Sequence, residues 1–178
     1  MALYERYCSS FEEFSSYEDF KANFKMHPTE DFNFAYDCMD VLAREKPDKV
    51  AMRWVNTVGE KHDFTFKQLK YYSDKTANFL ASRGIGKGDT VMLILKRHYE
   101  YWWTILALHK LGAVAIPASN LLTPKDIVYR CNRASVKAVV CTADGDISKL
   151  VDEAAPACPT LKLLITTDVA RKPGWVDF

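Results

Sequence analysis

The period of apolar and polar positions changes along the chain. Residues 50–55 alternate between two sets of side chains, with Val50, Met52 and Trp54 on one side and Ala51, Arg53 and Val55 on the other. Residues 62–66 are extended again after a polar turn, so the pattern predicts a β-hairpin. Thr65 and Gln68 have the spacing of a capping box. Apolar residues then recur at helical spacing as far as Arg83, which predicts a helix that follows the second strand directly.

From residue 90 onward, short apolar runs alternate with segments of helical spacing. The predicted strands are rich in β-branched residues and have no clean polar face; they span residues 91–95, 113–116, 137–141 and 161–166. The predicted helices between them span residues 99–111, 124–133 and 147–155. Strands buried on both faces and joined by helices form parallel sheets. We therefore predict an α/β fold, a three-layer sandwich with a mainly parallel sheet and an antiparallel hairpin.

The first part of the chain has a different character. It predicts a short aromatic helix at residues 17–25 and a second helix at residues 34–44. We place a boundary between an N-terminal helical extension, residues 1–31, and the α/β unit, residues 32–178. Residues 1–14 lack the continuous apolar core that a secretory signal requires. The most apolar stretch of the chain spans residues 101–108. It is far shorter than the about 20 residues that are needed to cross a bilayer.

Composition narrows the class of protein. Hydrophobic residues make up 48% and charged residues 26% of the chain, which is ordinary for a folded globular protein. The formal charge of +1 gives no strong field, so nucleic acid is not an expected partner. The five cysteines are odd in number and widely spaced, which argues against a disulfide framework or a zinc site. We expect reduced thiols in a cytoplasmic protein.

Several segments contain residues that could bind a ligand or a metal ion or take part in catalysis. For most of them the sequence context favours a structural role. The glycine-rich residues 84–88 follow a helix and precede a strand, the reverse of a phosphate cradle, so we expect a helix C-cap with Gly84 in the left-handed conformation. Asp144 and Asp146 precede a helix, where capping is favoured over a catalytic pair. The histidines show no metal-ligand spacing. An aromatic stripe favours core packing over a ligand wall; its members are Tyr99, Trp102, Trp103 and Leu106.

The loop at residues 117–122 is the best candidate for ligand contact. It leaves the carboxyl end of a predicted parallel strand, where open α/β sheets bind ligands. Ser119 and Asn120 could contact a ligand there, although such residues are also common in loops because they stabilise turns.

Three segments, taken in order, resemble the opening motifs of the adenylate-forming superfamily. They are Phe64-Thr-Phe-Lys-Gln-Leu69, Gly84-Ile-Gly-Lys-Gly-Asp-Thr-Val91, and Leu108-His-Lys-Leu-Gly-Ala-Val-Ala-Ile-Pro117 followed by Leu122-Thr-Pro124. The resemblance runs from about residue 32 to residue 178. Residues 54–56 and 100–103 are most similar to medium-chain acyl-CoA synthetases within the AMP-dependent synthetases and ligases.

This resemblance implies an acid–thiol ligase that uses ATP, magnesium and CoA to convert a carboxylic acid to its acyl-CoA. The superfamily's phosphate loop, its acidic magnesium contacts and its catalytic lysine have no counterpart in this sequence. The resemblance therefore implies an incomplete N-terminal part of the AMP-binding domain, inactive alone, with no catalytic or metal residue and no cofactor bound. It also implies that Ser119, Asn120 and Lys149 could line a substrate or CoA channel.

Two alternatives to this ligase stay open at this point. The chain could be a self-standing α/β module that binds a ligand or a partner without catalysis. It could also belong to another branch of the superfamily, such as the aryl-acid ligases. We further expect self-association or low solubility of the chain, because removal of covering parts exposes apolar surface.

Overall fold

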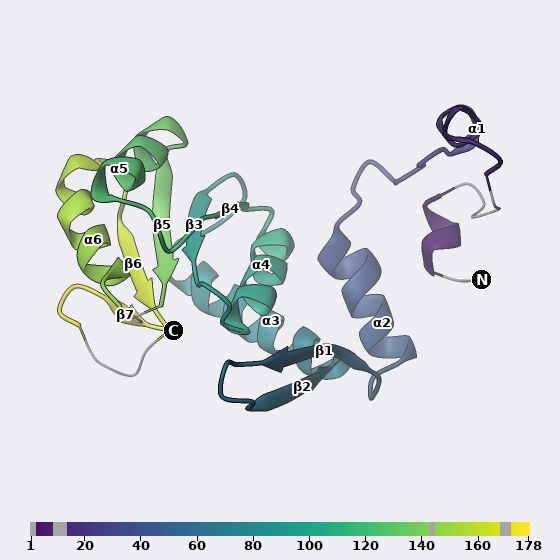
Figure 1. The fold of residues 1–178 in the computed structure, drawn as a ribbon, viewed down its shortest axis with the longest axis horizontal. Helices are drawn as coiled ribbons and strands as arrows, with labels where there is room; N and C mark the ends of the chain where they lie inside the picture. Colours follow the sequence, from purple (N-terminus) through teal and green to yellow (C-terminus); the bar gives the residue numbers. More distant parts are fainter. Residues whose placement is uncertain (1–2, 9–13, 143–144, 168–171) are drawn as a thin grey trace.

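The computed structural model describes residues 3–8, 14–142, 145–167 and 172–178. Its centre is a five-stranded parallel sheet with the strand order β4-β3-β5-β6-β7. The strands are β3 (Thr90–Ile94), β4 (Val114–Pro117), β5 (Val136–Cys141), β6 (Leu163–Thr166) and β7 (Val176–Asp177). Figure 1 shows the sheet with helices on both of its sides.

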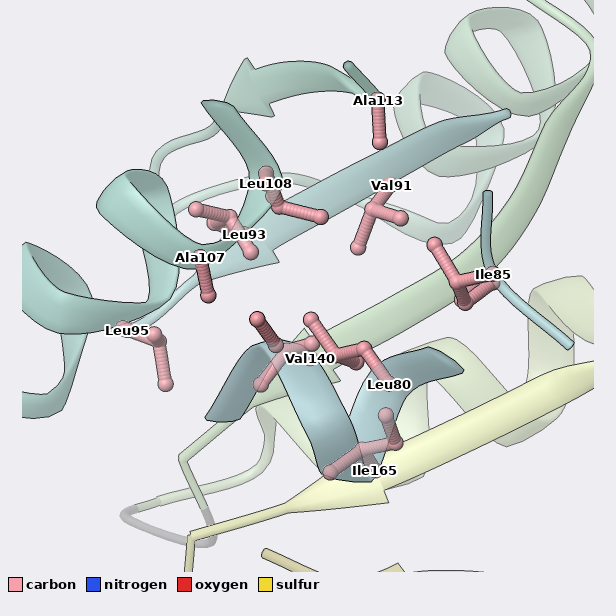
Figure 2. Packing of buried hydrophobic residues seen from close by; sticks show 12 residues of the cluster. Leu80, Ile85, Val91, Leu93, Leu95, Ala107, Leu108, Ala113, Val140 and Ile165 are labelled. Atoms are coloured by element: carbon pink, nitrogen blue, oxygen red, sulfur yellow. The ribbon is translucent and has the colours of Figure 1, made fainter. Parts of the chain in front are cut away.

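Helices cover both faces of the sheet, which confirms the predicted three-layer sandwich. On one face, α3 (Phe66–Ser82) and α4 (Glu100–Leu111) bury a cluster that includes Leu80, Val91, Leu108 and Val140 (Figure 2). On the other face, α5 (Pro124–Arg133) and α6 (Ile147–Ala154) bury a second cluster; its members include Met92, Ile94, Ile127, Val139 and Val151. Successive residues of β3 alternate between the two clusters, so this strand needs apolar side chains on both faces.

The ends of the helices follow the predicted capping signals. The capping boxes at Thr65 and Thr123 are both formed, with the side chains of Gln68 and Asp126 returning to the cap backbone. Gly84 has a φ of 82°, and the amide of Ile85 donates to the carbonyl of Leu80 at 3.0 Å. The predicted left-handed C-cap is confirmed, and Gly84 ends α3.

The predicted hairpin consists of β1 (Val50–Val55) and β2 (Lys61–Thr65), which pair antiparallel. Aromatic side chains pack it against the start of α4. The ring of Trp54 lies 5.2 Å from that of Tyr99, and the ring of Phe64 lies 5.5 Å from that of Trp103. The hairpin therefore stands beside the carboxyl end of β3, where the chain turns into α4.

The N-terminal segment is attached to α3 and α4 through polar contacts. It contains η1 (Leu3–Arg6), α1 (Tyr17–Asn23), a π-helical turn η2 (Phe34–Met39) and α2 (Asp40–Glu45). The side chain of Lys110, 2% exposed, donates to Asp40 at 2.9 Å and to Asp74 at 2.6 Å. Figure 1 shows α1 far from the sheet, and α1 has no buried residue. The boundary at residue 31 stays a prediction.

Some local predictions were wrong. We expected the helix of α4 to include Tyr99, and the structure begins it at Glu100. Asp146 occupies the N-cap position of α6 but makes no cap hydrogen bond, because its carboxylate pairs with Lys149 at 2.8 Å. Asp144 lies outside the described residues. No helix in the described part of the chain has the length and apolar character needed to cross a membrane.

Candidate functional site

The strand order identifies where a ligand is expected. β4 and β5 lie on opposite sides of β3, so the chain reverses its direction of winding between β3 and β5. Open α/β sheets bind ligands in the crevice outside the carboxyl ends of strands at such a switch point. The loops that follow β3, β4 and β5 therefore frame the candidate site.

A crevice of about 600 Å³ lies at this edge of the sheet. We define the crevice by the three segments that line it: residues 54–57 of the hairpin, residues 96–98 after β3 and residues 118–120 after β4. Its volume is in the range of small-molecule sites. Ser119 and Asn120, which the sequence predicted, both line it.

Ser119 and Asn120 are available to a ligand to different degrees. The Ser119 side chain is exposed, and its hydroxyl accepts a hydrogen bond from the amide of Leu121 at 3.1 Å. Ser119 therefore stabilises the turn, which was the alternative to ligand contact for this residue. Asn120 is half-buried and faces the same crevice. Their contact with a substrate or with CoA stays a prediction.

The loop after β3 is held in a strained conformation. Lys96, the second residue beyond the strand, has a φ of 47°, which is uncommon for a residue with a side chain. The amide of His98 donates to the carbonyl of Leu95 at 2.9 Å, and the indole N–H of Trp54 donates to the carbonyl of Arg97 at 2.6 Å. The hairpin and the strand end together fix the loop, and strain held in this way is found most often at functional sites.

His98 connects the loop to β5 and to α4. Its Nε2 lies 3.2 Å from the hydroxyl of Thr142, the residue after β5, and its Nδ1 lies 3.8 Å from a carboxylate oxygen of Glu100. Burial raises the pKa of Glu100, while the nearby His98 favours the charged carboxylate. These contacts orient the imidazole at the edge of the crevice.

The charges of the crevice favour an anion. Lys96 and Arg97 line it, both side chains are exposed, and no lining residue is acidic. Arginine and lysine recognise phosphate and carboxylate groups through charge-assisted hydrogen bonds. The sequence analysis missed Lys96, Arg97 and His98, although the rule that selected the loop after β4 applies equally to the loop after β3.

The structure does not bring Lys149 to the crevice. It lies in the first turns of α6, where its ammonium pairs with the carboxylate of Asp146 and its side chain is exposed. That hydrogen bond raises the pKa of Lys149. The aromatic stripe is divided as well, because Trp103 and Leu106 are buried in the interior while Trp102 is 52% exposed.

The described residues contain no metal site, and two cysteines of the core have strongly raised pKa values. No group of three or more histidine, cysteine, aspartate or glutamate residues among them could hold a metal ion. Burial raises the pKa of Cys131 and of Cys141 to about 12. Because the thiolate is the reactive form, both cysteines are inert residues of the core.

Comparison with known proteins gives a consistent picture. The family model of the AMP-binding enzymes matches residues 39–177. Acyl-coenzyme A synthetase ACSM5, mitochondrial, of Rattus norvegicus is 37% identical over 153 residues, which are 83% of this chain and 26% of the relative. Acyl-coenzyme A synthetase ACSM3, mitochondrial, of Homo sapiens is 34% identical over 168 residues, which are 91% of this chain and 28% of the relative.

These comparisons also show how much of its relatives the chain covers, and they correct the location expected from the sequence. The chain spans about a quarter of the length of the curated relatives it matches. The expected cytoplasmic location is contradicted, because these relatives are named as mitochondrial proteins. The composition and the cysteine pattern on which we based that location are compatible with either compartment.

Proposed function

The chain belongs to the AMP-binding enzyme family, and from this premise we propose that it is the N-terminal portion of an ATP-dependent acyl-CoA ligase. The observation that carries the proposal is the cationic crevice at the carboxyl ends of β3 and β4, in a chain whose relatives are acyl-coenzyme A synthetases. The motif resemblance and the family comparison agree. A self-standing binding module is not favoured by these relatives.

The proposed reaction has two steps. A carboxylate oxygen attacks the α-phosphorus of ATP, and pyrophosphate leaves with the electron pair of the broken P–O bond, which gives an acyl-adenylate. The thiol sulfur of CoA then attacks the acyl carbon, AMP leaves, and the thiol proton passes to a base. The first step is required because a free carboxylate has no good leaving group.

In this scheme the chain supplies one wall of the channel for CoA or the acyl group. Lys96 and Arg97 offer positive charge to a phosphate, and Ser119 and Asn120 offer polar contacts in the same crevice. Lys149 is a weaker candidate for ligand contact than these residues, because its ammonium must break its ion pair with Asp146 before it can reach a ligand.

The reacting groups are assigned to residues outside this chain. The superfamily's phosphate loop and catalytic lysine have no counterpart in the sequence, and the described residues do not fit a magnesium site. Any magnesium ion of the reaction is therefore assigned to residues outside this chain. The chain alone is expected to bind part of the substrate surface and to catalyse neither step.

We further propose a fatty acid of medium chain length as the substrate and the mitochondrion as the location. The substrate rests on the similarity of residues 54–56 and 100–103 to medium-chain synthetases, and the location rests on the printed names of the relatives. Staining of source cells with an antibody against this chain tests the location.

The function is tested on the protein captured from source cells with the same antibody. Incubation with ATP, CoA and a panel of carboxylic acids should produce acyl-CoA and AMP in equal amounts, most rapidly with an acid such as octanoate. The absence of acyl-CoA with every acid in the panel would contradict the proposed activity. A preference for benzoate would retain the ligase and overturn the medium-chain assignment.

A further inference from the structure

A second pocket, of about 360 Å³, is lined by residues of α3 and α4 and by Phe178, the residue that follows β7. We call it the aromatic pocket, because four of the side chains that line it are aromatic: Tyr72 and Phe79 of α3, Trp103 of α4, and Phe178. It shares no lining residue with the crevice. Its volume is in the range of small-molecule sites.

The aromatic rings of this pocket pack against one another in pairs. Tyr72 stacks on Trp103 with the ring centres 4.8 Å apart, and Phe79 meets Phe178 edge to face at 6.0 Å. The face of an aromatic ring carries partial negative charge and attracts a cation that lies within about 6 Å of its centre. A pocket with such walls can hold an apolar group or an organic cation.

The carboxylate of Glu100, which also lines the aromatic pocket, favours the cation. The Glu100 side chain is 18% exposed, and its Oε2 is buried without a hydrogen-bond partner in the described part of the chain. Nδ1 of His98 lies 3.8 Å from this oxygen, which is too far for a hydrogen bond. A buried acceptor without a donor is costly, and more so when it is charged. A ligand that brings both a positive charge and an N–H donor removes this cost.

The other charged residue of the pocket, Lys75, does not supply that donor. Its side chain is exposed, and its ammonium lies over the ring of Tyr71, 5.5 Å from the ring centre. Tyr71 does not line the pocket, so this ammonium is engaged outside it. Burial raises the pKa of Glu100, because the ionised carboxylate is held in poorly solvated surroundings. A cation inside the pocket would offset that penalty.

We propose that the aromatic pocket binds the primary ammonium group of a small aliphatic amine. The ammonium donates a hydrogen bond to Oε2 of Glu100, and the alkyl chain lies against the rings of Trp103 and Phe178. A quaternary ammonium is a poorer ligand because it has no N–H to donate, and an alcohol is a poorer ligand because it has no charge. The proposal does not rest on the ligase function, since the amine undergoes no reaction and the crevice is not involved.

The test is a titration of the 178-residue chain with butylammonium, followed by the ¹⁵N–¹H signals of the tryptophan indoles. Butylammonium should shift the Trp103 signal in a saturable manner and leave unchanged that of Trp175, which packs on the other face of the sheet. Butan-1-ol and butyltrimethylammonium, titrated in the same way, should each bind about tenfold more weakly. The proposal is overturned if butylammonium leaves Trp103 unshifted, or if either comparison ligand binds as tightly.

Substitution of the carboxylate gives the second arm. Glu100→Gln keeps the shape of the side chain and removes its charge, so it should weaken butylammonium binding about tenfold and leave butan-1-ol binding unchanged. Glu153→Gln, at an exposed glutamate of α6, is the matched control and should change neither. An unchanged affinity of Glu100→Gln for butylammonium would overturn the proposal.

Removal of one aromatic face gives an arm that does not disturb Glu100. Phe178→Leu keeps an apolar side chain but removes the ring, so it should weaken butylammonium binding about threefold and leave butan-1-ol binding unchanged. If neither Phe178→Leu nor Glu100→Gln separates the ammonium from the alcohol, the pocket does not recognise a cation.

A last comparison distinguishes a small amine from a lysine side chain of a protein. Nα-acetyl-lysine methylamide carries the same ammonium on a peptide backbone, and it should bind no more tightly than butylammonium. Tighter binding of the blocked lysine would overturn the assignment to a small amine and identify a protein partner instead. Neither result affects acyl-CoA formation by the captured protein.

Discussion

The sheet core and the attachment of the N-terminal segment are held by different forces. In the core, apolar side chains on β3 and β5 are 0–1% exposed and pack against helices on two faces. At the attachment, α2 meets α3 and α4 around one buried ammonium, that of Lys110, between Asp40 and Asp74. The stabilisation from apolar burial is spread over many core residues, whereas the stabilisation from the ion network depends on the single side chain of Lys110. The two regions should therefore respond differently to substitution, pH and salt.

The largest effect is expected in the core. Leu80 is 0% exposed and packs between α3 and the sheet, so Leu80→Ala removes buried methyl groups and leaves a cavity. We expect the free energy of unfolding to fall by about 2–5 kcal/mol. Urea denaturation followed by circular dichroism measures this loss. A change below about 1 kcal/mol would mean that the region collapses around the substitution.

A somewhat smaller loss is expected at the attachment. Lys110→Met keeps the length of the side chain but leaves the carboxylate of Asp40, 6% exposed, without its nearest partner. Lys70 lies 3.4 Å from Asp40 and compensates in part, so we expect a loss of about 3 kcal/mol.

The matched control is the double variant Lys110→Met with Asp40→Leu, which removes the uncompensated charge. Recovery of most of the lost free energy in this variant identifies the unpaired carboxylate as the cause. If the double variant is as unstable as the single one, packing rather than charge holds α2 in place.

The attachment should also depend on pH where the core does not. Desolvation acts to raise the pKa of Asp74, but hydrogen bonds from Lys110 and Lys70 outweigh it and lower this pKa below its usual 3.8. A lowered carboxyl pKa adds stability above the pKa of the unfolded chain. This stability is lost as the pH falls through about 4 towards the lower pKa of the folded chain.

Urea denaturation between pH 7 and pH 3 measures this dependence. The decline in stability below about pH 4 should be smaller in Asp74→Asn than in the unsubstituted chain. Equal slopes in the two proteins would show that Asp74 does not contribute to the acid lability.

The smallest effect is expected at Asn33. Its side chain accepts a hydrogen bond from the amide of Ala35 at 3.0 Å and donates to the carbonyl of His109 at 2.7 Å. Asn33→Ala should cost about 1 kcal/mol. Hydrogen exchange should show the loss at residues 34–45 and not in the sheet. Faster exchange throughout β3 would contradict the separation of the two regions.

Local signals made the sheet and its helices predictable. The capping pairs at Thr65 and Thr123 fix where α3 and α5 begin, and the apolar runs identify β3 and β5 because both faces of those strands are buried. β7 was missed because a strand of two residues has no readable period. The Lys110 network was missed because its partners lie 36 and 70 residues away in sequence.

The candidate site was predictable only in part. The loop after β4 was found because it leaves a parallel strand at its carboxyl end, and Ser119 and Asn120 lie in the crevice. Trp54 was missed as a wall residue because its place there depends on how the hairpin packs on the loop after β3. The role of Lys149 could not be judged from sequence, since its distance from the crevice follows from the placement of α6.

The exchange of pyrophosphate into ATP tests the account most directly. With octanoate present, the protein captured from source cells should catalyse acid-dependent exchange, and the isolated 178-residue chain should catalyse none. Exchange by the isolated chain would contradict the assignment of the chemistry to residues outside it. The absence of exchange by the captured protein with every acid tested would contradict the proposed ligase itself.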